Sequence, residues 1–278
     1  MNVVLVPFAK THLQGALKLS QEMSWAHRIE DWDVALGLGQ GFVLQDEAGE
    51  VIGTAIWWAY GEAHASTGMI IVAKAAQGRG YGARLMDALL AAAHPRAMML
   101  NSTAEGAALY KRRGFVPIGV IQQHQGVPRE RNEAPPHSLV RTMAASDFEA
   151  VVRLDLEATG WARQPMLRRL IEIGDGYVLA REGVTRGYAV CRLFGRGHVI
   201  GPVVAENPDD ARALIEATLA RLGSVFVRVD TTVNSQLGEW LEGIGLQKVS
   251  DVTTMVLGAQ VQSTGPARMF ALASQAFN

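Results

Sequence analysis

Three glycines at alternate positions, Gly78, Gly80 and Gly82, stand where a run of helix-forming residues begins. Glycine inside a helix costs roughly 1 kcal/mol relative to alanine, so this placement indicates that something must approach the backbone more closely than a side chain would allow. A phosphate group suits such a position, because a helix start presents unpaired N–H groups and the positive end of the helix dipole. The segment "AAQGRGYGARLMDALL" (75–90) therefore predicts an anion-binding loop followed by a helix.

Two other phosphate-binding designs can be compared with this loop. A Walker loop needs Lys followed by Ser or Thr after its last glycine, but Ala83 and Arg84 follow Gly82 here, which excludes it. A dinucleotide-binding fold needs G-x-G-x-x-G at the end of its first strand. The spacing here is G-x-G-x-G after the fourth predicted strand, so that design is only weakly supported.

The loop from Gln77 to Gly82 resembles the Q/R-x-x-G-x-G/A signature of the GNAT N-acetyltransferase superfamily, whose loop amides hold the pyrophosphate of acetyl-coenzyme A. The later segment "TAEGAALYKRRGF" (103–115) is similar to the N-x-x-A-x-x-L-Y-x-x-x-G-F pattern of the same family. It keeps Tyr110, but Thr103 stands where the family usually has asparagine and Gly106 where it usually has alanine. The resemblance implies an acyltransferase of the N-acetyltransferase type that uses acetyl-CoA as cosubstrate and no metal.

The resemblance also implies roles for individual residues. Tyr110 would protonate the departing thiolate, since a phenol with a pKa of about 10 suits a thiol leaving group. The other interpretation of Tyr110 is a core aromatic residue. Besides Thr103 and Tyr110, the residues that the resemblance assigns to acetyl-CoA are Ile70, Ile71 and Val72, through their backbone, and Gln77, Gly78, Arg79, Gly80, Tyr81, Gly82 and Ala83.

The general base is the least defined part of the site. His64 and Ser66 share one face of the predicted strand His64–Val72, and a neutral His64 could accept the proton of the amine. Glu62, at the preceding turn, is a weaker alternative. A surface histidine near a turn is the plainer interpretation of His64.

The segment "SWAHRIEDW" (24–32) occupies the region where GNAT proteins shape the acceptor pocket. Trp25, Asp31 and Trp32 are predicted to bind the substrate, because aromatic walls with a carboxylate suit a cationic amine. Packing of an amphipathic helix explains both tryptophans equally well.

Strand-like and helix-like patterns alternate through residues 1–124, which predicts an α+β domain with a mixed, mostly antiparallel sheet flanked by helices. The predicted strands are Val3–Ala9, two within Gly41–Tyr60, His64–Val72, Ala97–Asn101 and Phe115–Gln123, and the predicted helices are Thr11–Met23, the helix that ends near Ala93, and Ala104–Arg113. Residues 125–137 are rich in proline and charge and are predicted to be a linker.

The second half, residues 138–278, repeats the first. A shift of 131 residues places Ala108–Phe115 over Glu239–Leu246 and Ala76–Gly82 over Asn207–Ala213. One shift that serves two separate segments indicates a duplication. The chain is therefore similar to tandem-GNAT proteins of the YitH-like type.

The repeat has lost the features of a cofactor site. In place of the glycine loop it has Pro208, Asp209 and Asp210, which stabilise a helix start and repel a pyrophosphate. Leu241 replaces Tyr110, although Asn234 keeps the family's asparagine. We expect a degenerate GNAT-like domain that acts as a scaffold on the substrate side. Its segment "GWARQPMLRRL" carries Trp161, Arg163, Arg168 and Arg169, which either face the acceptor cleft or form a solvated basic face.

The composition narrows the function classes. The 278 residues are 49% hydrophobic and 19% charged with a net charge of −1, which gives no basic field for nucleic acid or an anionic membrane. The N-terminal segment has no leader pattern and no apolar run is long enough to span a membrane, so we expect a cytoplasmic monomer or homodimer. The single cysteine, Cys191, lies in an alternating strand pattern and is predicted to be a buried, inert thiol.

Two functions remain open from the sequence. One is an N-acetyltransferase in which the amine of a small molecule attacks acetyl-CoA directly, without a covalent intermediate. The alternative is a non-catalytic acyl-CoA-binding or sensing module. Thr103 and the lack of an evident base favour the alternative, whereas Tyr110 favours the enzyme.

Overall fold

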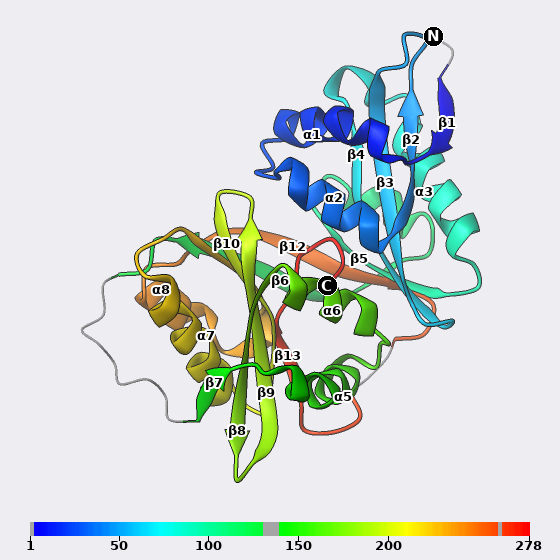
Figure 1. Ribbon diagram of the computed structural model, residues 1–278. Helices are drawn as coiled ribbons and strands as arrows, with labels where there is room; N and C mark the ends of the chain where they lie inside the picture. Colours follow the sequence, from blue (N-terminus) through cyan, green and yellow to red (C-terminus); the bar gives the residue numbers. More distant parts are fainter. Residues whose placement is uncertain (1–2, 130–138, 261–262) are drawn as a thin grey trace.

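The computed structural model describes residues 3–129, 139–260 and 263–278. The first half of the chain is an α+β unit in which the expected helices and strands are all present (Figure 1). Its elements are β1 (Val4–Pro7), α1 (Leu13–Glu22), α2 (Ile29–Leu38), β2 (Gln40–Gln45), β3 (Val51–Tyr60), β4 (His64–Val72), α3 (Tyr81–Ala93), β5 (Ala97–Ser102), α4 (Ala107–Lys111) and β6 (Val116–Gly126), with 3-10 turns at Lys10–His12 and Lys74–Ala76.

The second half repeats this order and adds one strand at its end. The shift of 131 residues carries the bounds of β6, 116 and 126, onto 247 and 257, which are the bounds of β12. The elements are β7 (Val140–Thr142), α5 (Phe148–Thr159), α6 (Gln164–Glu172), β8 (Gly174–Arg181), β9 (Val184–Phe194), β10 (Gly197–Ala205), α7 (Pro208–Leu222), β11 (Val227–Thr232), α8 (Gly238–Gly243), β12 (Gln247–Leu257) and β13 (Arg268–Ala271), with 3-10 turns at Ala145–Asp147 and Val233–Ser235.

The sheets of the two halves join into one. The strand order in the described residues is β1-β2-β3-β4-β5-β12-β6-β11-β13-β10-β9-β8-β7. Strand β12 of the second half lies between β5 and β6 of the first, and β6 lies between β12 and β11. Each half therefore contributes one strand to the other half's sheet. This exchange was not expected from the sequence.

The start of the predicted linker is wrong. Strand β6 continues to Gly126, and Gln125 pairs with Gln247 of β12 on one side and Arg228 of β11 on the other. The polar residues before Gly126 resemble a loop in sequence, but two flanking strands satisfy their backbone groups. Residues 130–137 of the predicted linker lie outside the described residues.

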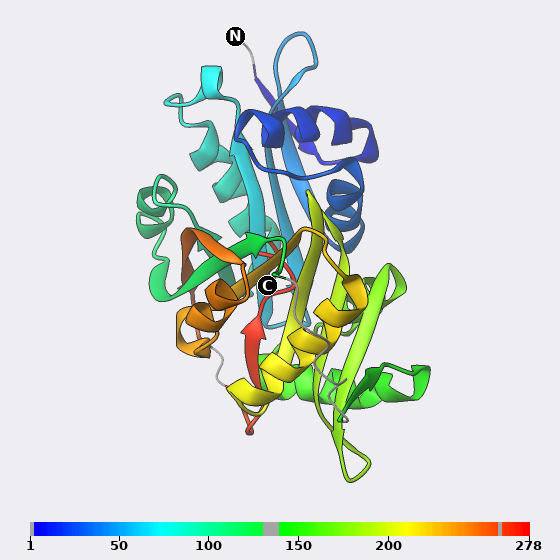
Figure 2. The same cartoon turned by 90° about the vertical axis from the view of Figure 1, so that its left-hand side faces the viewer.

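The helices cover the sheet in two ways. Helices α1, α2, α5 and α6 share one continuous core, which includes Trp32, Val151, Leu170 and Tyr188. On the opposite face, α3 and α4 pack over the first half and α7 and α8 over the second, in two separate cores. Figure 2 shows α1 and α2 on one side of the first-half strands and α3 on the other. The shared core and the exchanged strands hold the halves in one arrangement.

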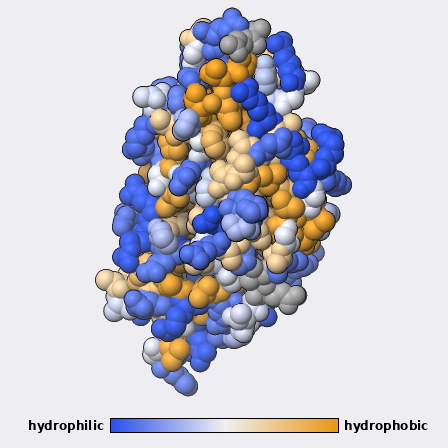
Figure 3. Space-filling model, turned by 90° about the vertical axis from the view of Figure 1, so that its right-hand side faces the viewer, coloured by the Kyte–Doolittle hydropathy of each residue, from blue (hydrophilic) through white to orange (hydrophobic). Residues whose placement is uncertain are grey.

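The surface is mixed in polarity. On the face drawn in Figure 3, hydrophobic residues are interrupted by hydrophilic ones. Of the helices that the structure describes, none combines the length and apolar character needed to cross a membrane. The prediction for Cys191 is confirmed: the side chain is buried in β9, and burial raises the pKa of its thiol to about 12.

Candidate functional site

The glycine loop connects the end of β4 to the start of α3. Gly78 and Gly80 have φ angles of 76° and 81°, a left-handed conformation that glycine adopts without strain. A Cβ atom added at either position would meet no atom within 4 Å, so both face open space. The Gln77 side chain donates from Nε2 to the carbonyl of Val72 at 3.0 Å, which ties the loop to β4.

The start of α3 is suited to an anion. Gly80 is its N-cap and makes no side-chain cap, and the first turn carries no acidic residue. The N–H groups of this turn and the positive end of the helix dipole therefore remain available to an external acceptor. Of the neighbouring basic residues, Arg84 donates to the carbonyl of Val3 at 2.7 Å and serves the fold.

Strands β4 and β5 separate along their length. They pair in parallel only from His64 to Ser66, opposite Ala97 to Met99, and then diverge. Past that point β4 has a bulge, in which Met69 has a φ of 54° and its carbonyl accepts a hydrogen bond from the Thr54 hydroxyl at 2.8 Å. The gap between the two strands exposes backbone groups of β4 that have no partner strand on that side.

A cleft opens beside this gap, and we call it the first cleft. It has a volume of about 540 Å³ and is lined by the α1–α2 loop, the β4 bulge, the end of β5, strands β6 and β12, the β9–β10 turn and the C-terminal segment. Its walls combine aromatic rings with amide and hydroxyl side chains. They include Trp25, His27, Asn101, Thr103, Gln123, Gln125, Phe194, Phe226 and Ser250.

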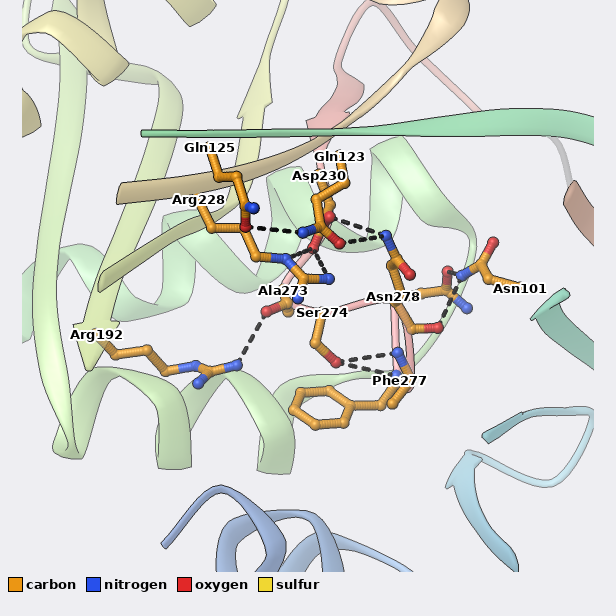
Figure 4. Close-up of polar contacts among 12 residues, drawn as sticks. Asn101, Gln123, Gln125, Arg192, Arg228, Asp230, Ala273, Ser274, Phe277 and Asn278 are labelled. Carbon is orange, nitrogen blue, oxygen red and sulfur yellow. Dashed lines mark hydrogen bonds and ion pairs between the residues drawn. The ribbon is translucent and has the colours of Figure 1, made fainter. Parts of the chain in front are cut away.

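The C-terminal segment, residues 272–278, runs between the halves and forms one wall of this cleft (Figure 1). One side chain from each half holds its main chain: the buried Arg192 donates to the carbonyl of Ala273 at 3.0 Å, and the partly buried Asn101 donates to the carbonyl of Gln275 at 3.0 Å. Figure 4 shows both side chains directed at the segment. Phe277 is anchored against Trp58, with ring centroids 5.4 Å apart.

Tyr110 is buried on α4 in the core beneath α3, and it is not among the residues that line the first cleft. Its ring packs edge-on against Phe115 at 6.1 Å, and burial raises the pKa of its hydroxyl to about 12. A Cβ atom at Gly106 would lie 3.0 Å from the Tyr110 ring, so an alanine there would require a small shift of the ring. Thr103, one turn earlier, lines the cleft and accepts from the Gly106 N–H at 3.4 Å.

His27 is the buried titratable group of the first cleft. Burial lowers the pKa of its imidazole to about 4, and the positive charge of Arg228 adds to this effect. Its ring packs against Phe194 of the second half at 5.4 Å. At neutral pH His27 is therefore an uncharged ring that can form hydrogen bonds.

The structure does not bring His64 to this cleft. The residue lies at the paired end of β4, where its ring stacks on Trp161 at 6.3 Å, and it does not line the cleft. Ser66 is buried and donates to the Tyr60 hydroxyl at 3.1 Å. The period-two argument placed His64 and Ser66 on one strand face, but it could not show that Trp161, from the loop between α5 and α6 of the other half, packs against His64.

Two of the three predicted substrate-binding residues are structural. Trp32 is fully buried and donates from Nε1 to Ser20 at 3.1 Å. Asp31 is buried, pairs with Arg28 at 2.8 Å and accepts from the Gly195 N–H of the second half at 2.9 Å. Trp32 is thus held within the core of the first half and Asp31 by contacts with both halves, and of the three residues only Trp25 lines the cleft.

The four aromatic and basic residues of the second half divide into two pairs. Trp161 and Arg163 are buried between the halves, and Arg163 pairs with Asp155 at 2.5 Å and donates to the Asn278 carbonyl at 2.7 Å. Arg168 and Arg169 are exposed. The interpretation as a solvated basic face is therefore correct only for Arg168 and Arg169.

The start of α7 differs from that of α3. Helix α7 begins at Pro208, so the positions that correspond to the glycine loop are its first turn. The Asn207 side chain accepts from the Asp210 N–H at 2.9 Å, and Asp210 pairs with Arg181. The chain's own side chains thus satisfy the helix start that could bind an anion.

The gap between β10 and β11 also differs from its counterpart. These strands pair in parallel only at His198 and Val199, as β4 and β5 do at their start. Beyond that point β13 enters the gap and pairs with both, through Val203↔Ala271 and Thr231↔Ala271. The groove that is open in the first half is therefore filled in the second.

Several residues of the first cleft were not predicted. The bulge at Met69 leaves no sequence signal, and Gln123, Gln125 and the C-terminal segment reach the cleft only through the exchanged strands. Gly68 did carry a signal, because an isolated glycine in a strand often marks a close backbone approach. A Cβ atom there would lie 3.0 Å from the backbone of Ala276.

The comparisons with known proteins agree with this architecture. Models of the GNAT acetyltransferase domain match residues 38–117 and residues 151–271, one in each half. The chain belongs to the GNAT acetyltransferase family, and it is a tandem GNAT acyltransferase.

Two curated relatives extend over most of the chain. An uncharacterized N-acetyltransferase named YitH from Bacillus subtilis is 25% identical over 77% of this chain and 78% of its own length. A holothin acyltransferase from a Pseudoalteromonas species is 25% identical over 84% of this chain and 83% of its own. A solved structure, a putative acetyltransferase from Pyrococcus horikoshii, shares the fold, with a TM-score of 0.82 and 18% identity over 99% of this chain and 96% of that one.

Proposed function

We propose that the first half binds acetyl-CoA and transfers its acetyl group to an amine of a small molecule held in the first cleft. The observation that carries this proposal is the open gap between β4 and β5, which leads from the first cleft to the uncapped start of α3. The second half is the scaffold that completes the cleft.

The loop would hold the pyrophosphate through its backbone. Gly78 and Gly80 face open space beside the positive end of α3, and Gln77 ties the loop to β4, which supports this assignment. The pantetheine arm would lie along the unpaired side of β4, against the backbone of Ile70, Ile71 and Val72. Thr103, which follows β5 and lines the first cleft, would contact the same arm.

The reaction would proceed by direct attack of the neutral amine on the thioester carbonyl. The new C–N bond forms as the C–S bond breaks, and the thiolate takes a proton. The backbone at the Met69 bulge would polarise the thioester carbonyl, since the bulge takes this part of β4 out of the regular strand register. Tyr110 would supply the proton, since its phenol, with a pKa of about 12, is protonated at neutral pH.

The proton of the amine requires a separate acceptor. His64 does not line the first cleft, and His27, which does, is a weak base with a pKa of about 4. We assign His27 the role of a neutral hydrogen-bond partner for the acceptor, with the proton passing to solvent. Trp25 and Phe194 would pack against the carbon skeleton of the acceptor.

Thiol release from acetyl-CoA in the presence of a panel of small amines tests the proposal. We expect amine-dependent release of CoA and acetylated amine as product. Acetyl-CoA that stabilises the protein without amine-dependent release would instead indicate the binding or sensing module. If acetyl-CoA does not stabilise the protein and no CoA is released, the assignment of the site is refuted.

A further inference from the structure

Two strands in the wall of the first cleft carry a pair of polar side chains, Arg228 on β11 and Gln125 on β6. The two residues are register partners, so their side chains lie side by side on one face of the sheet. The shift of 131 residues places Ala97 and Val256 at the corresponding positions of the other copy. The fold therefore does not itself require an arginine and a glutamine here.

The Arg228 guanidinium is held in one orientation by Asp230, a fully buried carboxylate (Figure 4). Its Nε donates to Asp230 at 2.9 Å, and its Nη2 lies 2.8 Å from the same oxygen. The third nitrogen, Nη1, has no partner among the described residues. It is open to solvent, unlike the sealed Nε of Arg192, and the side chain, which is 18% exposed, lines the first cleft. One nitrogen of a fixed guanidinium is therefore available to a ligand in the cleft.

A chain of amide side chains fixes the orientation of Gln125 (Figure 4). Gln275 donates from Nε2 to Asp230 at 3.0 Å and to Oε1 of Gln123 at 3.4 Å. Gln123 in turn donates from Nε2 to Oε1 of Gln125 at 3.0 Å. Because a carboxylate only accepts, the order of donors and acceptors is set from Asp230 outward. Gln125 therefore presents its Nε2, a donor that has no partner in the described part of the chain and is open to the cleft.

Positive charge is in excess on this side of the cleft. Arg192 is buried next to the C-terminal segment and has no acidic ion-pair partner among the residues described, so Asp230 balances only one of two neighbouring arginines. Burial lowers the pKa of Arg192 to about 10, and the positive charge of Arg228 adds to this effect. Arg196, in the β9–β10 turn, is exposed and lines the same cleft. An anion beside these groups would be stabilised.

The acidic residues of the region do not cancel this excess. Asp31 is paired with Arg28 at 2.8 Å, and Asp251 is paired with Lys248 at 3.1 Å. Glu105 lies in the loop after β5, on the side of the cleft where the proposed function places the pantetheine arm. The cleft thus carries basic groups on one side and an acidic group on the other, which suits a molecule with an anionic and a cationic end.

We propose that the acceptor is an amine that also carries a carboxylate, and that Arg228 and Gln125 bind this carboxylate. The inference rests on the proposed function and names its substrate class. The carboxylate would accept from Nη1 of Arg228 and Nε2 of Gln125, which are both held in place before it binds. The amino group at the other end of the molecule would attack the thioester, so the product is an N-acetylated carboxylic acid.

Thiol release from acetyl-CoA with matched pairs of amines tests the substrate class. The pairs are glycine, β-alanine, γ-aminobutyrate, leucine and phenylalanine, each with its primary amide, which keeps the size of the head group and removes its charge. We expect the best acid to have a kcat/KM at least roughly ten-fold above that of its amide. Acetylation of acids and amides with equal kcat/KM would refute the carboxylate site and leave the proposed function standing.

The N-acetyl derivatives of the same acids and amides give a measurement that needs no acetyl transfer. Calorimetric titration of the full chain should show that at least one N-acetyl acid binds roughly ten-fold more tightly than its amide. If no amine releases CoA but this difference in affinity is found, the proposed function fails and the carboxylate site stands. Equal affinity of acid and amide, or no saturable binding of either, would refute the site.

Gln125→Glu keeps the chain of amides and reverses the character of the site. The new carboxylate can still accept from Gln123, but it replaces the open donor by a negative charge beside Arg228. We expect kcat/KM for the best acid to fall at least roughly ten-fold and that for its amide to stay within about two-fold. Gln14→Glu makes the same change of charge at an exposed position of α1 and should alter neither value.

Two outcomes of the Gln125→Glu measurement would overturn the proposal. An equal loss for acid and amide would show that the side chain serves only the structure. A smaller CoA-induced rise in Tm than in the wild-type protein would assign the open donors to the cofactor instead of the acceptor.

Arg228→Lys provides a second variant at the same site. It keeps a positive charge beside Asp230 and loses the nitrogen that faces the cleft, so kcat/KM for the acid should fall about five-fold while that for the amide is unchanged. Thermal melting followed by circular dichroism would verify that each variant is folded. An unchanged preference for the acid in a folded Arg228→Lys protein would refute the role of Nη1.

Discussion

The two halves of this chain share a strand order and differ at the start of one helix. In the first half a loop with two left-handed glycines precedes α3, and no side chain caps the helix. In the second half the corresponding residues are already helical, and Asn207 caps α7. A change of a few residues thus decides whether the same fold offers an anion site or closes it.

The grooves beside these helices also differ, and again it is the first half that is open and the second half that is closed. The gap between β4 and β5 has no strand in it, whereas β13 fills the gap between β10 and β11. The second half completes the sheet of the first and supplies part of the lining of the first cleft. If the proposed function is correct, a duplicated domain has lost a cofactor site and still serves as structure.

The largest expected effect is at the glycine loop. Gly80→Asp places a carboxylate beside the expected pyrophosphate and should abolish the rise in Tm that CoA produces. Gly80→Asn has nearly the same shape without the charge and should keep part of that rise. Asp209→Asn, at an exposed position of the second half, is the matched control and should leave the full shift. A full shift in Gly80→Asp would remove the loop from the site.

The stoichiometry of CoA binding addresses both halves at once. Because the second-half groove holds β13 and its helix start is capped, one chain should bind one CoA. Calorimetric titration of the full chain measures this number directly. A value near two would show that filling the groove does not close it and would break the contrast between the halves.

Tyr110 is the next difference, because Leu241 replaces it in the second half. Tyr110→Phe should lower kcat by roughly ten- to thousand-fold and leave the CoA-induced rise in Tm in place, since only the proton donor is lost. The pKa of about 12 also means that the acid form should persist through pH 10. Full activity in Tyr110→Phe, measured by thiol release, would make the ring a packing residue.

The smallest effect concerns pH, through His27 of the first cleft and its apolar counterpart Ala158 in the second half. The folded-state pKa of His27, about 4, is below the unfolded value of 6.5. The unfolded chain therefore binds a proton first, and this group lowers the free energy of unfolding as the pH falls from about 6.5 to about 4.

Urea denaturation at pH 7 and pH 5 would measure the effect of His27. At pH 5 the loss from this one residue should be about 2 kcal/mol relative to pH 7, and His27→Phe should remove it while keeping a ring against Phe194. An equal loss between the two pH values in the wild-type protein and the variant would assign the pH dependence to other groups.

The sequence by itself determined the local elements and their duplication. Glycine spacing and apolar periodicity depend on neighbouring residues, so they predicted β4, the loop and α3. The 131-residue shift compares two segments of the same chain, so it predicted the degenerate start of α7. Tyr110 and the loop were found because their signal is a contiguous pattern. They stay predictions as catalytic and binding residues until the experiments above are done.

Only the tertiary structure decided which strands pair and what lines the first cleft. Any strand presents the same N–H and C=O groups at its edges, so no residue of β12 specifies β5 as its neighbour. The same holds for the C-terminal segment, whose polar contacts with the rest of the chain include distant residues such as Asn101 and Arg192. For this reason Asp31 was predicted to bind the substrate and His64 to be the general base, although residues of the second half contact both side chains.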